Sequence, residues 1–387
     1  MSDPYAAAPE DRFSFGLWTV GHRGGDPFGL PTRPPVEPET IVERLAEVGA
    51  WGVSLHDDDL VPFGSSPAER DRIVARFAEA VRGAGLCVPM TTVDLFRQPV
   101  FKDGALTAAD PAVRRFALRK AVAAIDIGAE LGAGIFVLWG GREGVESGAA
   151  RDPRVALERY REGVDFLCEY VRSQGLATRI ALEAKPNEPR AHIYLPTTGH
   201  MLHFIETLAH PEMLGVNPEM AHESMAGLSF SQSVGQALWA GKLFHVDLNS
   251  QNGPRFDQDF RFGAEDLKEA FLAVRLLERS GYDGPRHFDA RAYRSEDDID
   301  VYAAFARGCI RNYKILAAKA AAFDTNEAIQ AACDKAGAAQ LSEPTPGFSP
   351  EVLEAIRDED FTALLANTEG RHHEAADQLM IEHILGI

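Results

Sequence analysis

The amino-acid sequence predicts an α/β fold, a (β/α)8 TIM barrel with a C-terminal helical extension. Eight short apolar runs alternate with longer amphipathic stretches as far as residue 323, and no strand candidate follows. Repeated strand-then-helix units indicate a parallel sheet, and eight such units can close a barrel. An open doubly wound sheet is the alternative, but no GxGxxG follows the first run, which disfavours a dinucleotide-binding version. The expected strands span 15–18, 52–56, 88–91, 135–139, 180–183, 214–217, 243–248 and 287–289.

The intervening helices have readable ends. Ser66-Pro67-Ala68-Glu69 has the pattern of a capping box with proline at the first helical position. Asp110-Pro111 and Asp152-Pro153 each place an N-cap acid before a proline. Glycines stand where the helices should end, a position that favours a left-handed residue: Gly85, Gly132, Gly175 and Gly281.

We expect the chain to divide into a barrel domain, residues 1–323, and a helical C-terminal arm, residues 324–387. Apolar residues such as Leu364, Leu365 and Met380 recur in the arm. Low hydrophobicity normally marks disorder. This composition therefore favours an arm that packs against something over the alternative, a partly disordered terminus.

Composition excludes several classes of protein. The formal charge is −19, and no basic stripe suggests a nucleic-acid partner. No apolar stretch is long enough for a membrane helix, and no secretory signal is visible, so we expect a cytoplasmic protein without a membrane partner. The four scattered cysteines suggest buried thiols in a reducing compartment. Residues 322–387 hold 13 acids and 3 bases, so a net −10 of the acidic excess lies in the tail.

Acidic residues gather where the strands of the predicted barrel end. Barrel enzymes build their sites at the carboxyl ends of the strands. Converging carboxylates repel each other and are costly to desolvate, and a cation relieves both penalties. Any one of these acids alone could be an ordinary salt-bridge partner; four on consecutive strands favour metal. They are Glu183, Glu219, Asp247 and Asp289.

Two further groups enlarge the cluster. His222 follows Glu219 by three residues, and Asp257 and Asp259 alternate along one loop. Six acids and one imidazole suit two ions that share Glu219. Oxygen-rich ligation favours Mg²⁺ or Mn²⁺ over Zn²⁺, with Co²⁺ able to substitute.

Other candidate residues flank this cluster. Lys185 could hydrogen-bond a substrate oxygen, or merely balance charge. His56 needs a carboxylate to fix its tautomer, and Asp59, three residues on, is the expected partner. The intervening Asp57 and Asp58 are interpreted as a solvated loop. Aromatic side chains at the barrel mouth could form a dry wall against a sugar: Trp18, Phe96 and Trp139.

Several stretches resemble xylose isomerase of the shorter class, the family also known as glucose isomerase. They include Trp139-Gly140-Gly141-Arg142-Glu143-Gly144, Lys185-Pro186-Asn187-Glu188-Pro189-Arg190 and Asp257-Gln258-Asp259. The likeness covers about residues 11–323 closely and the tail loosely. It implies a homotetrameric, divalent-metal isomerase that converts D-xylose to D-xylulose and D-glucose to D-fructose by ring opening and a 1,2-hydride shift.

The resemblance also implies individual roles. Two divalent ions per subunit would be held, one by Glu183, Glu219, Asp247 and Asp289, the other by Glu219, His222, Asp257 and Asp259. Lys185 would contact the oxygen on the first sugar carbon, and His56, oriented by Asp59, would assist ring opening. Trp139 and Phe96 would wall the pocket, and Phe28 would complete the pocket of a neighbouring subunit. Residues 1–323 would be the catalytic domain, and the arm, residues 324–387, would serve subunit association.

The sequence departs from the family pattern at four places that leave the expected metal ligands intact. Asp94 stands where close relatives carry Asn, and His22 stands where Trp is usual. Ala184 replaces a proline, and Arg291-Ala292-Tyr293-Arg294 replaces a Lys-Pro-Pro-Arg run. The first and last of these changes bear on sugar preference or on the pH profile, and not on reaction class.

Two other classes of function compete with an isomerase. A related metal barrel, such as a sugar epimerase or a zinc-dependent abasic-site endonuclease, is one. The endonuclease would need more imidazole ligands and a basic rim. A non-catalytic sugar-binding barrel is the other, and it would be expected to lack Lys185, His56 or a metal acid.

Overall fold

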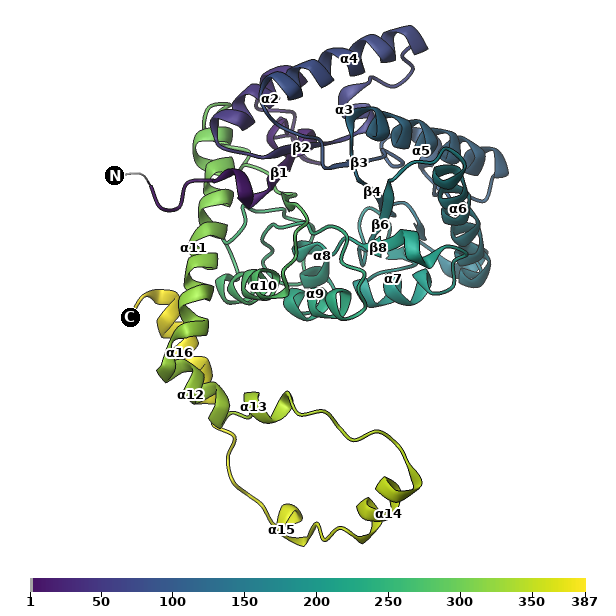
Figure 1. Cartoon of the computed structure of the whole chain (residues 1–387). Coiled ribbons are helices and arrows are strands. Elements are labelled where there is room, and N and C mark those ends of the chain that lie inside the picture. The colour runs from purple at the N-terminus through teal and green to yellow at the C-terminus, as the bar shows by residue number, and fades with distance from the viewer. Residues whose placement is uncertain (1–2) are drawn as a thin grey trace. The chain divides into compact units, whose positions relative to one another are not determined.

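The computed structural model describes residues 3–387 and has a curled parallel sheet surrounded by helices (Figure 1). Seven strands follow the order β8-β6-β4-β3-β2-β1-β9, and every neighbouring pair is parallel. They are β1 (Phe13–Gly16), β2 (Gly52–His56), β3 (Met90–Thr92), β4 (Ile135–Trp139), β6 (Arg179–Glu183), β8 (Leu214–Val216) and β9 (Arg286–Phe288).

The expected seventh strand, residues 243–248, closes the barrel without forming a regular ladder. Single parallel bridges join Val216 to Leu243 and Asp247 to His287, so the segment lies between β8 and β9. The amides of Phe244 and His245 both point at the carbonyl of Val216, at 3.2 and 3.4 Å. Two residues facing one partner interrupt a ladder as a bulge does. The predicted barrel is confirmed, with this seam as its irregular strand.

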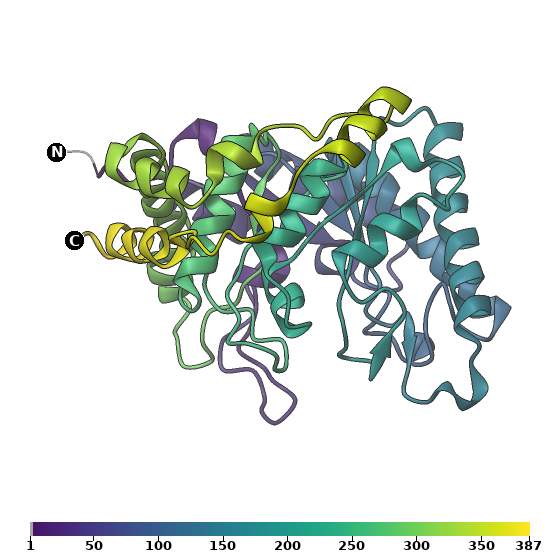
Figure 2. The same ribbon diagram turned by 90° about the horizontal axis from the view of Figure 1, so that it is seen from below.

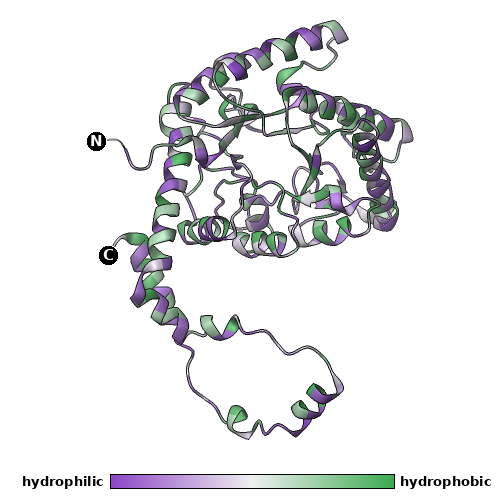
Figure 3. Ribbon diagram, in the orientation of Figure 1, coloured by the Kyte–Doolittle hydropathy of each residue, from purple (hydrophilic) through white to green (hydrophobic). Residues whose placement is uncertain are grey.

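A helix follows each strand or the seam and covers the outside of the barrel (Figure 1). These helices are α2 (Pro38–Glu47), α4 (Pro67–Gly83), α5 (Pro111–Leu131), α6 (Pro153–Ser173), α7 (Thr198–Ile205), α9 (Phe230–Trp239), α10 (Leu267–Ser280) and α11 (Arg307–Thr325), the last preceded by a π-helical segment, Val301–Ala306. Most carry hydrophilic and hydrophobic stretches together, as amphipathic helices do (Figure 3).

The helix ends follow the predicted signals. The Ser66 hydroxyl accepts the Glu69 amide, and the carboxylates of Asp110 and Asp152 accept the amides two residues on. Gly132 ends α5 with φ +81°, a left-handed conformation that glycine adopts without a Cβ penalty.

Alternation along the strands produces two hydrophobic layers. Ile135 and Val137 of β4 face the barrel interior with Met90, Ala181 and Phe244. The alternate residues of the same strand, Phe136 and Leu138, face outward into the layer beneath α5 and α6. This period of two directs each strand's last residue either into the mouth of the barrel or toward the helices.

Short elements lie in the loops at one end of the barrel. They are α1 (Leu17–Val20), α3 (Asp57–Leu60), α8 (Met220–Met225) and an antiparallel pair, β5 (Gly144–Val145) with β7 (His192–Ile193). In Figure 2 the arrows of β5 and β7 lie on the same side of the barrel as the long purple loop that follows α1. These loops follow the carboxyl ends of the strands, where a site was expected.

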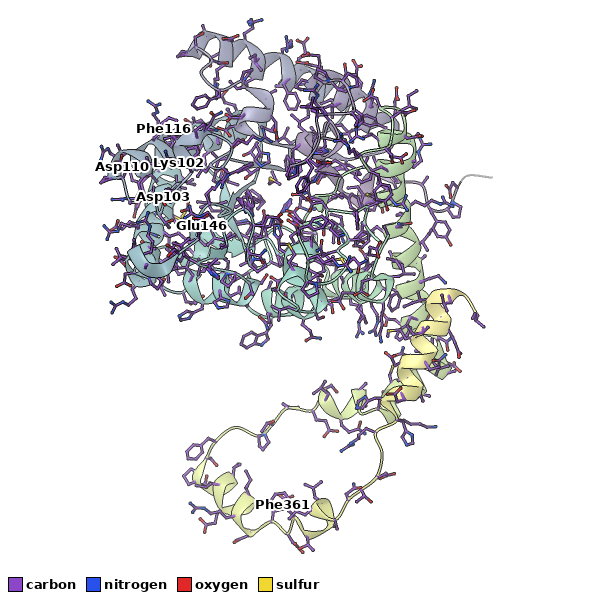
Figure 4. The ribbon with its side chains drawn as sticks, turned by 180° about the vertical axis from the view of Figure 1, so that it is seen from behind. Lys102, Asp103, Asp110, Phe116, Glu146 and Phe361 are labelled. Carbon is purple, nitrogen blue, oxygen red and sulfur yellow. The ribbon has the colours of Figure 1, made fainter. Side chains whose placement is uncertain are left out.

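The chain separates into two compact units, Met1–Ile315 and Leu316–Ile387. The second contains the end of α11 and the helices α12 (Glu327–Lys335), α13 (Ala338–Leu341), α14 (Pro350–Asp358), α15 (Thr362–Leu365) and α16 (His373–Leu385). Within it, Ile329 of α12 and Met380 and Ile384 of α16 are buried, whereas Leu365 is 85% exposed. Phe361, labelled in Figure 4, is also exposed. The predicted helical extension is confirmed, and much of its middle lacks a core of its own.

Over residues 3–387, no helix is long and apolar enough to cross a membrane. The four cysteines, all within that range, form no disulfide.

Candidate active site

The acids predicted from the strand ends line one cavity of about 410 Å³ in the barrel unit. Register places them at one level. Glu183 ends β6 opposite Trp139 of β4, and single bridges pair Glu219 with Asp247 and Asp247 with His287. The same cavity is lined by the other predicted site residues Lys185, His56, Phe96, Trp139 and Trp18. Further lining comes from His222 on α8, Asp257 and Asp259 on the loop after the seam, and Asp289 after β9.

Burial and mutual repulsion dominate the electrostatics of this cluster. Burial, reinforced by the charges of Asp247 and Asp289, raises the pKa of Glu183 well above its usual range. Burial and the nearby aspartates likewise raise the pKa of Glu219. Such shifts mean that the bare cluster holds its negative charges at high energy, which a bound cation would relieve.

Two aspartates are exceptions because they have cationic or imidazole partners. Burial would raise the pKa of Asp257, but the Lys185 ammonium and His222 outweigh it and lower the pKa. Asp247 is affected similarly, since His287 and His245 outweigh its burial. His287 Nδ1 lies 2.7 Å from Asp247 Oδ1, which fixes the orientation of this carboxylate.

Within residues 3–387, four groups of ligand atoms could hold a metal ion, each with its atoms within 4.8 Å of one another. Glu219 belongs to three of them: with Glu183 and His222, with Asp247 and Asp289, and with Asp257 and Asp259. Among the described residues, Asp257 Oδ1 and His222 Nδ1 are buried and have no hydrogen-bond partner. Unpartnered buried acceptors beside crowded carboxylates fit divalent cations.

Two asparagines that the sequence reading missed hold the carboxylates in place. Asn217 Nδ2 donates to Glu183 at 3.0 Å and to Asp247 at 2.7 Å. Asn249 Nδ2 donates to Glu219 at 2.8 Å and to Asp259 at 3.2 Å. Both asparagines stand at the ends of apolar runs that were expected to be strands, so their positions could have indicated a place in the site. The sequence prediction considered charged residues at those positions and omitted neutral amides.

Lys185 reaches the cluster from the loop after β6. Its ammonium is 2.6 Å from Asp257 Oδ2 and 5.3 Å from the centre of the Trp139 ring. Although burial opposes the charged form, the carboxylates of Asp257 and Asp259 raise the pKa of Lys185. A buried, firmly protonated amine at this place can donate a hydrogen bond to a substrate oxygen.

His56 ends β2, and Asp59 lies behind it, outside the cavity wall. Asp59 Oδ2 is 2.8 Å from His56 Nδ1 and accepts the His56 amide at 3.0 Å. This is the pairing expected from the spacing. If Nδ1 donates to the carboxylate, Nε2 is left as an acceptor toward the cavity.

Aromatic rings form one continuous wall. Trp18 meets His56 edge-on with ring centroids 4.5 Å apart, His56 meets Phe96 at 5.6 Å, and Phe96 meets Trp139 at 4.9 Å. Trp18 Nε1 also donates to Asp289 Oδ1 at 2.7 Å, so the wall is tied to the acidic floor.

Loop residues that strand-end reading did not nominate as site residues also line the cavity. His22, Arg97 and Arg291 do so, and the strand residues Met90 and Thr92 of β3 and Val137 of β4 add to the lining. Arg291 pairs with Asp259, whose pKa burial and the Asp257 charge raise to about 6. Burial, with help from Arg291, lowers the pKa of His22 to about 4.

Asp57, Asp58 and Phe28 lie outside the lining of this cavity. Asp57 and Asp58 do not form a solvated loop: Asp57 is buried in α3, and both carboxylates contact the ammonium of Lys120 on α5. That interpretation was wrong because the partner lies 63 residues away, beyond any local pattern. Phe28 is fully exposed and does not line this chain's cavity.

Loops around the site are braced by buried charges. Arg190, 2% exposed, lies 2.8 Å from Glu146 and 3.6 Å from Asp103, two acids labelled in Figure 4. Glu143 accepts the amides of Leu106 and Thr107, each at 2.8 Å. The loops after β3, β4 and β6 are thereby joined, which holds Phe96, Trp139 and Lys185 at fixed positions.

Fold and site together define a class of protein: (β/α)8 barrels with a buried acidic cavity, suited to divalent cations, at the carboxyl ends of the strands. Residues 42–308 match the family described as xylose isomerase-like TIM barrel. The chain is 52% identical over 385 residues to xylose isomerase of Thermus thermophilus and 50% identical over 386 residues to that of Thermus caldophilus. In both cases 99% of each chain is covered. It belongs to the xylose isomerase family.

Solved structures support the fold. A putative xylose isomerase from Rhodospirillum rubrum superposes with a TM-score of 0.61 at 16% identity, covering 78% of this chain and 98% of that one. A D-psicose 3-epimerase superposes with a TM-score of 0.60 at 13% identity, covering 79% and 99%. At such identities the likeness concerns the barrel alone.

Proposed function

We propose that this chain is an intramolecular oxidoreductase, an aldose–ketose isomerase that converts D-xylose to D-xylulose and D-glucose to D-fructose. One observation carries the proposal: seven potential metal ligands, a buried ammonium and a histidine–carboxylate pair line or back a single cavity. The full-length likeness to proteins named xylose isomerase supports it.

Two divalent ions per chain would occupy the cluster, Mg²⁺ in the first place and Mn²⁺ or Co²⁺ as substitutes. Glu183, Glu219, Asp247 and Asp289 would hold one ion. Glu219, His222, Asp257 and Asp259 would hold the other, so that Glu219 serves both. When bound, such ions polarise the oxygens on adjacent sugar carbons and favour loss of a hydroxyl proton.

The chain's own groups would open the ring and place the open sugar. His56 Nε2 accepts the proton of the anomeric hydroxyl, the bond between the first carbon and the ring oxygen breaks, and the imidazolium returns the proton to the ring oxygen. Asp59 holds the imidazole in the required tautomer and stabilises its charged form.

Lys185 would then donate a hydrogen bond to the aldehyde oxygen on the first carbon. A hydride moves from the second carbon to the first, and the proton lost by the hydroxyl on the second carbon is made up by the proton that the first oxygen gains, so no net proton is released. The atoms balance without an external oxidant. The wall of Trp18, Phe96 and Trp139 would keep water away from the reacting carbons during the hydride shift.

Quaternary structure and location follow as parts of the same proposal. We place residues 324–387 in an arm that associates with neighbouring chains of a homotetramer, and Phe28 in a neighbour's pocket. The 85% exposure of Leu365 and the full exposure of Phe28 support this arrangement. The enzyme would work in the cytoplasm on a free sugar, without a nucleic-acid or membrane partner.

The test uses purified protein freed of metal by a chelator. Xylose is added first alone and then with Mg²⁺, Mn²⁺ or Co²⁺, and ketose formation is followed. We expect xylulose with at least one ion and none without. Absence of ketose with all three ions would overturn the proposed function.

A further inference from the structure

Arg97 lies between two carboxylates at the edge of the cavity. It follows Phe96 in the loop after β3, and its side chain is half exposed. Its Nε is 3.2 Å from Asp94 Oδ2, and Nη1 and Nη2 are each 3.4 Å from Asp59 Oδ1. One guanidinium therefore bridges a buried acid and the acid that supports His56.

Asp94 fixes where Arg97 stands. The carboxyl group of Asp94 is fully buried, and its Oδ1 accepts the amides of Phe96 and Arg97 at 3.1 and 2.9 Å. Within the described residues Oδ2 receives no hydrogen bond, because Arg97 Nε is close but out of line. A buried carboxylate is costly without a counter-charge, and Arg97 supplies one. Asp94 thus holds both the backbone and the head group of Arg97.

Asp59 divides its two oxygens between two partners. Oδ2 faces the amide and the ring of His56, which leaves Oδ1 for Arg97. Burial would raise the pKa of Asp59, but the charges and hydrogen bonds of His56, with the charge of Arg97, outweigh burial and lower the pKa. The carboxylate behind His56 is therefore held ionised from both sides.

We propose that Arg97, held by Asp94, is a positioning residue for sugar ring opening. It acts on the substrate through Asp59 and His56: an ionised, immobilised Asp59 keeps the proton on His56 Nδ1 and leaves Nε2 free for the anomeric hydroxyl. The inference rests on the proposed isomerase function. It gives the acid at position 94 a purpose, since an asparagine there could accept the same amides but would not pair with the guanidinium.

The role of Arg97 should differ between substrates that form a ring and substrates that do not. D-Xylose must be opened before the hydride shift, so its turnover depends on the His56–Asp59 pair. D-Glyceraldehyde has too few carbons to form a pyranose or furanose ring. Its isomerisation to dihydroxyacetone needs the metals and Lys185 but no ring opening. Loss of Arg97 should therefore affect the first substrate and spare the second.

The test compares Arg97→Met, the double variant Asp94→Asn/Arg97→Met and Arg97→Lys with the wild-type enzyme in saturating Mg²⁺. Arg72→Met is the matched control, because Arg72 lies on α4 and is 68% exposed. The double variant removes both charges, so no unpaired buried carboxylate threatens the fold. Metal content and thermal unfolding show that each variant is intact.

We expect the double variant to lose about fivefold in kcat for D-xylose, the size expected for one half-exposed charge contact. Its kcat for D-glyceraldehyde should match that of the wild type. Arg97→Lys should recover part of the loss, and Arg72→Met should lose nothing. Equal losses of kcat on both substrates would overturn the inference. Wild-type kcat for D-xylose in the double variant would also overturn it.

A second measurement needs no turnover. Nitrogen-15 spectra of histidine-labelled protein, with the His56 signals assigned from His56→Gln, report which ring nitrogens carry protons. We expect a protonated Nδ1 and a bare Nε2 in the wild type near neutral pH, and a mixture in the double variant. If the His56 signals are the same in the wild type and the double variant, the proposed role of Arg97 is wrong, whether or not xylose is a substrate. If the wild-type enzyme is inactive on xylose, that result counts against the proposed function alone.

Discussion

Replacing Lys120 by methionine should destabilise the barrel more than any exposed substitution. Lys120 on α5 and Asp57 on α3 are both 7% exposed, and the ammonium contacts the carboxylates of Asp57 and Asp58. Asp57 also accepts the amide of Asp94 at 2.9 Å, so it cannot turn outward without losing that bond. Removing one partner of a buried ion pair costs about 3–5 kcal/mol, because the other charge stays buried and uncompensated. We expect a loss of that size in the free energy of unfolding at pH 8.

The same loss should shrink in acid. Burial raises the pKa of Asp57 against the opposing charge of Lys120, and without Lys120 the pKa rises further. A carboxyl group whose folded-state pKa is raised binds its proton more tightly in the native state. The stability this contributes is fully present below the unfolded pKa and is lost as the pH rises through the folded one. The variant should therefore be nearer to wild type at about pH 5 than at about pH 8.

Urea unfolding at one fixed protein concentration, followed by circular dichroism, measures both effects. Asp57→Asn/Lys120→Met should recover most of the loss, because no charge remains buried. The control is Lys102→Met, at an exposed lysine labelled in Figure 4, which should change stability by less than about 0.5 kcal/mol. A loss below about 1 kcal/mol at pH 8, or the same loss at both pH values, would refute the reasoning.

Three further predictions concern the site. Glu219→Gln should abolish ketose formation and reduce bound metal from two ions per chain to less than one, because Glu219 belongs to three of the four ligand groups. Plasma emission spectrometry measures the metal content, and two ions retained would show that Glu219 is not a ligand shared by both ions. Lys185→Met should lower kcat by about 10²–10³-fold with both ions still bound, and loss of metal instead would mean that its role is structural. Phe28→Ala should raise KM for xylose while leaving the unfolding transition unchanged, because the side chain is fully exposed within its own chain; an unchanged KM would remove Phe28 from the neighbour's pocket.

Local patterns predicted most of the fold. Proline after an N-cap acid and glycine after a helix are short-range signals, and α5 begins and ends where those signals stand. The seam at residues 243–248 was harder, because its apolar run looks like a regular strand. The crowding of two amides on the Val216 carbonyl depends on how the barrel closes, which no local pattern encodes.

Residues at strand ends were predictable, whereas Arg97, which reaches the cavity from the loop after β3, was not. Glu183 and Asp247 have their places fixed by the sheet register. Arg97 reaches the site because Asp94 is buried and turns the loop back, a long-range consequence of packing. The pairing of Lys120 with Asp57 was not predicted either, because the two residues are far apart in the sequence and meet only in the folded chain.

Asp259 has a left-handed backbone conformation, with φ +48°, that most side chains avoid. A library of variants at this position should therefore give opposite answers under two kinds of selection. A screen for resistance to heat or protease in the absence of metal should enrich glycine, which fits the backbone and removes a crowded carboxylate. A screen for growth on the sugar should retain aspartate alone. Such a divergence would show that catalysis requires aspartate at position 259 whereas the stability of the metal-free fold favours glycine.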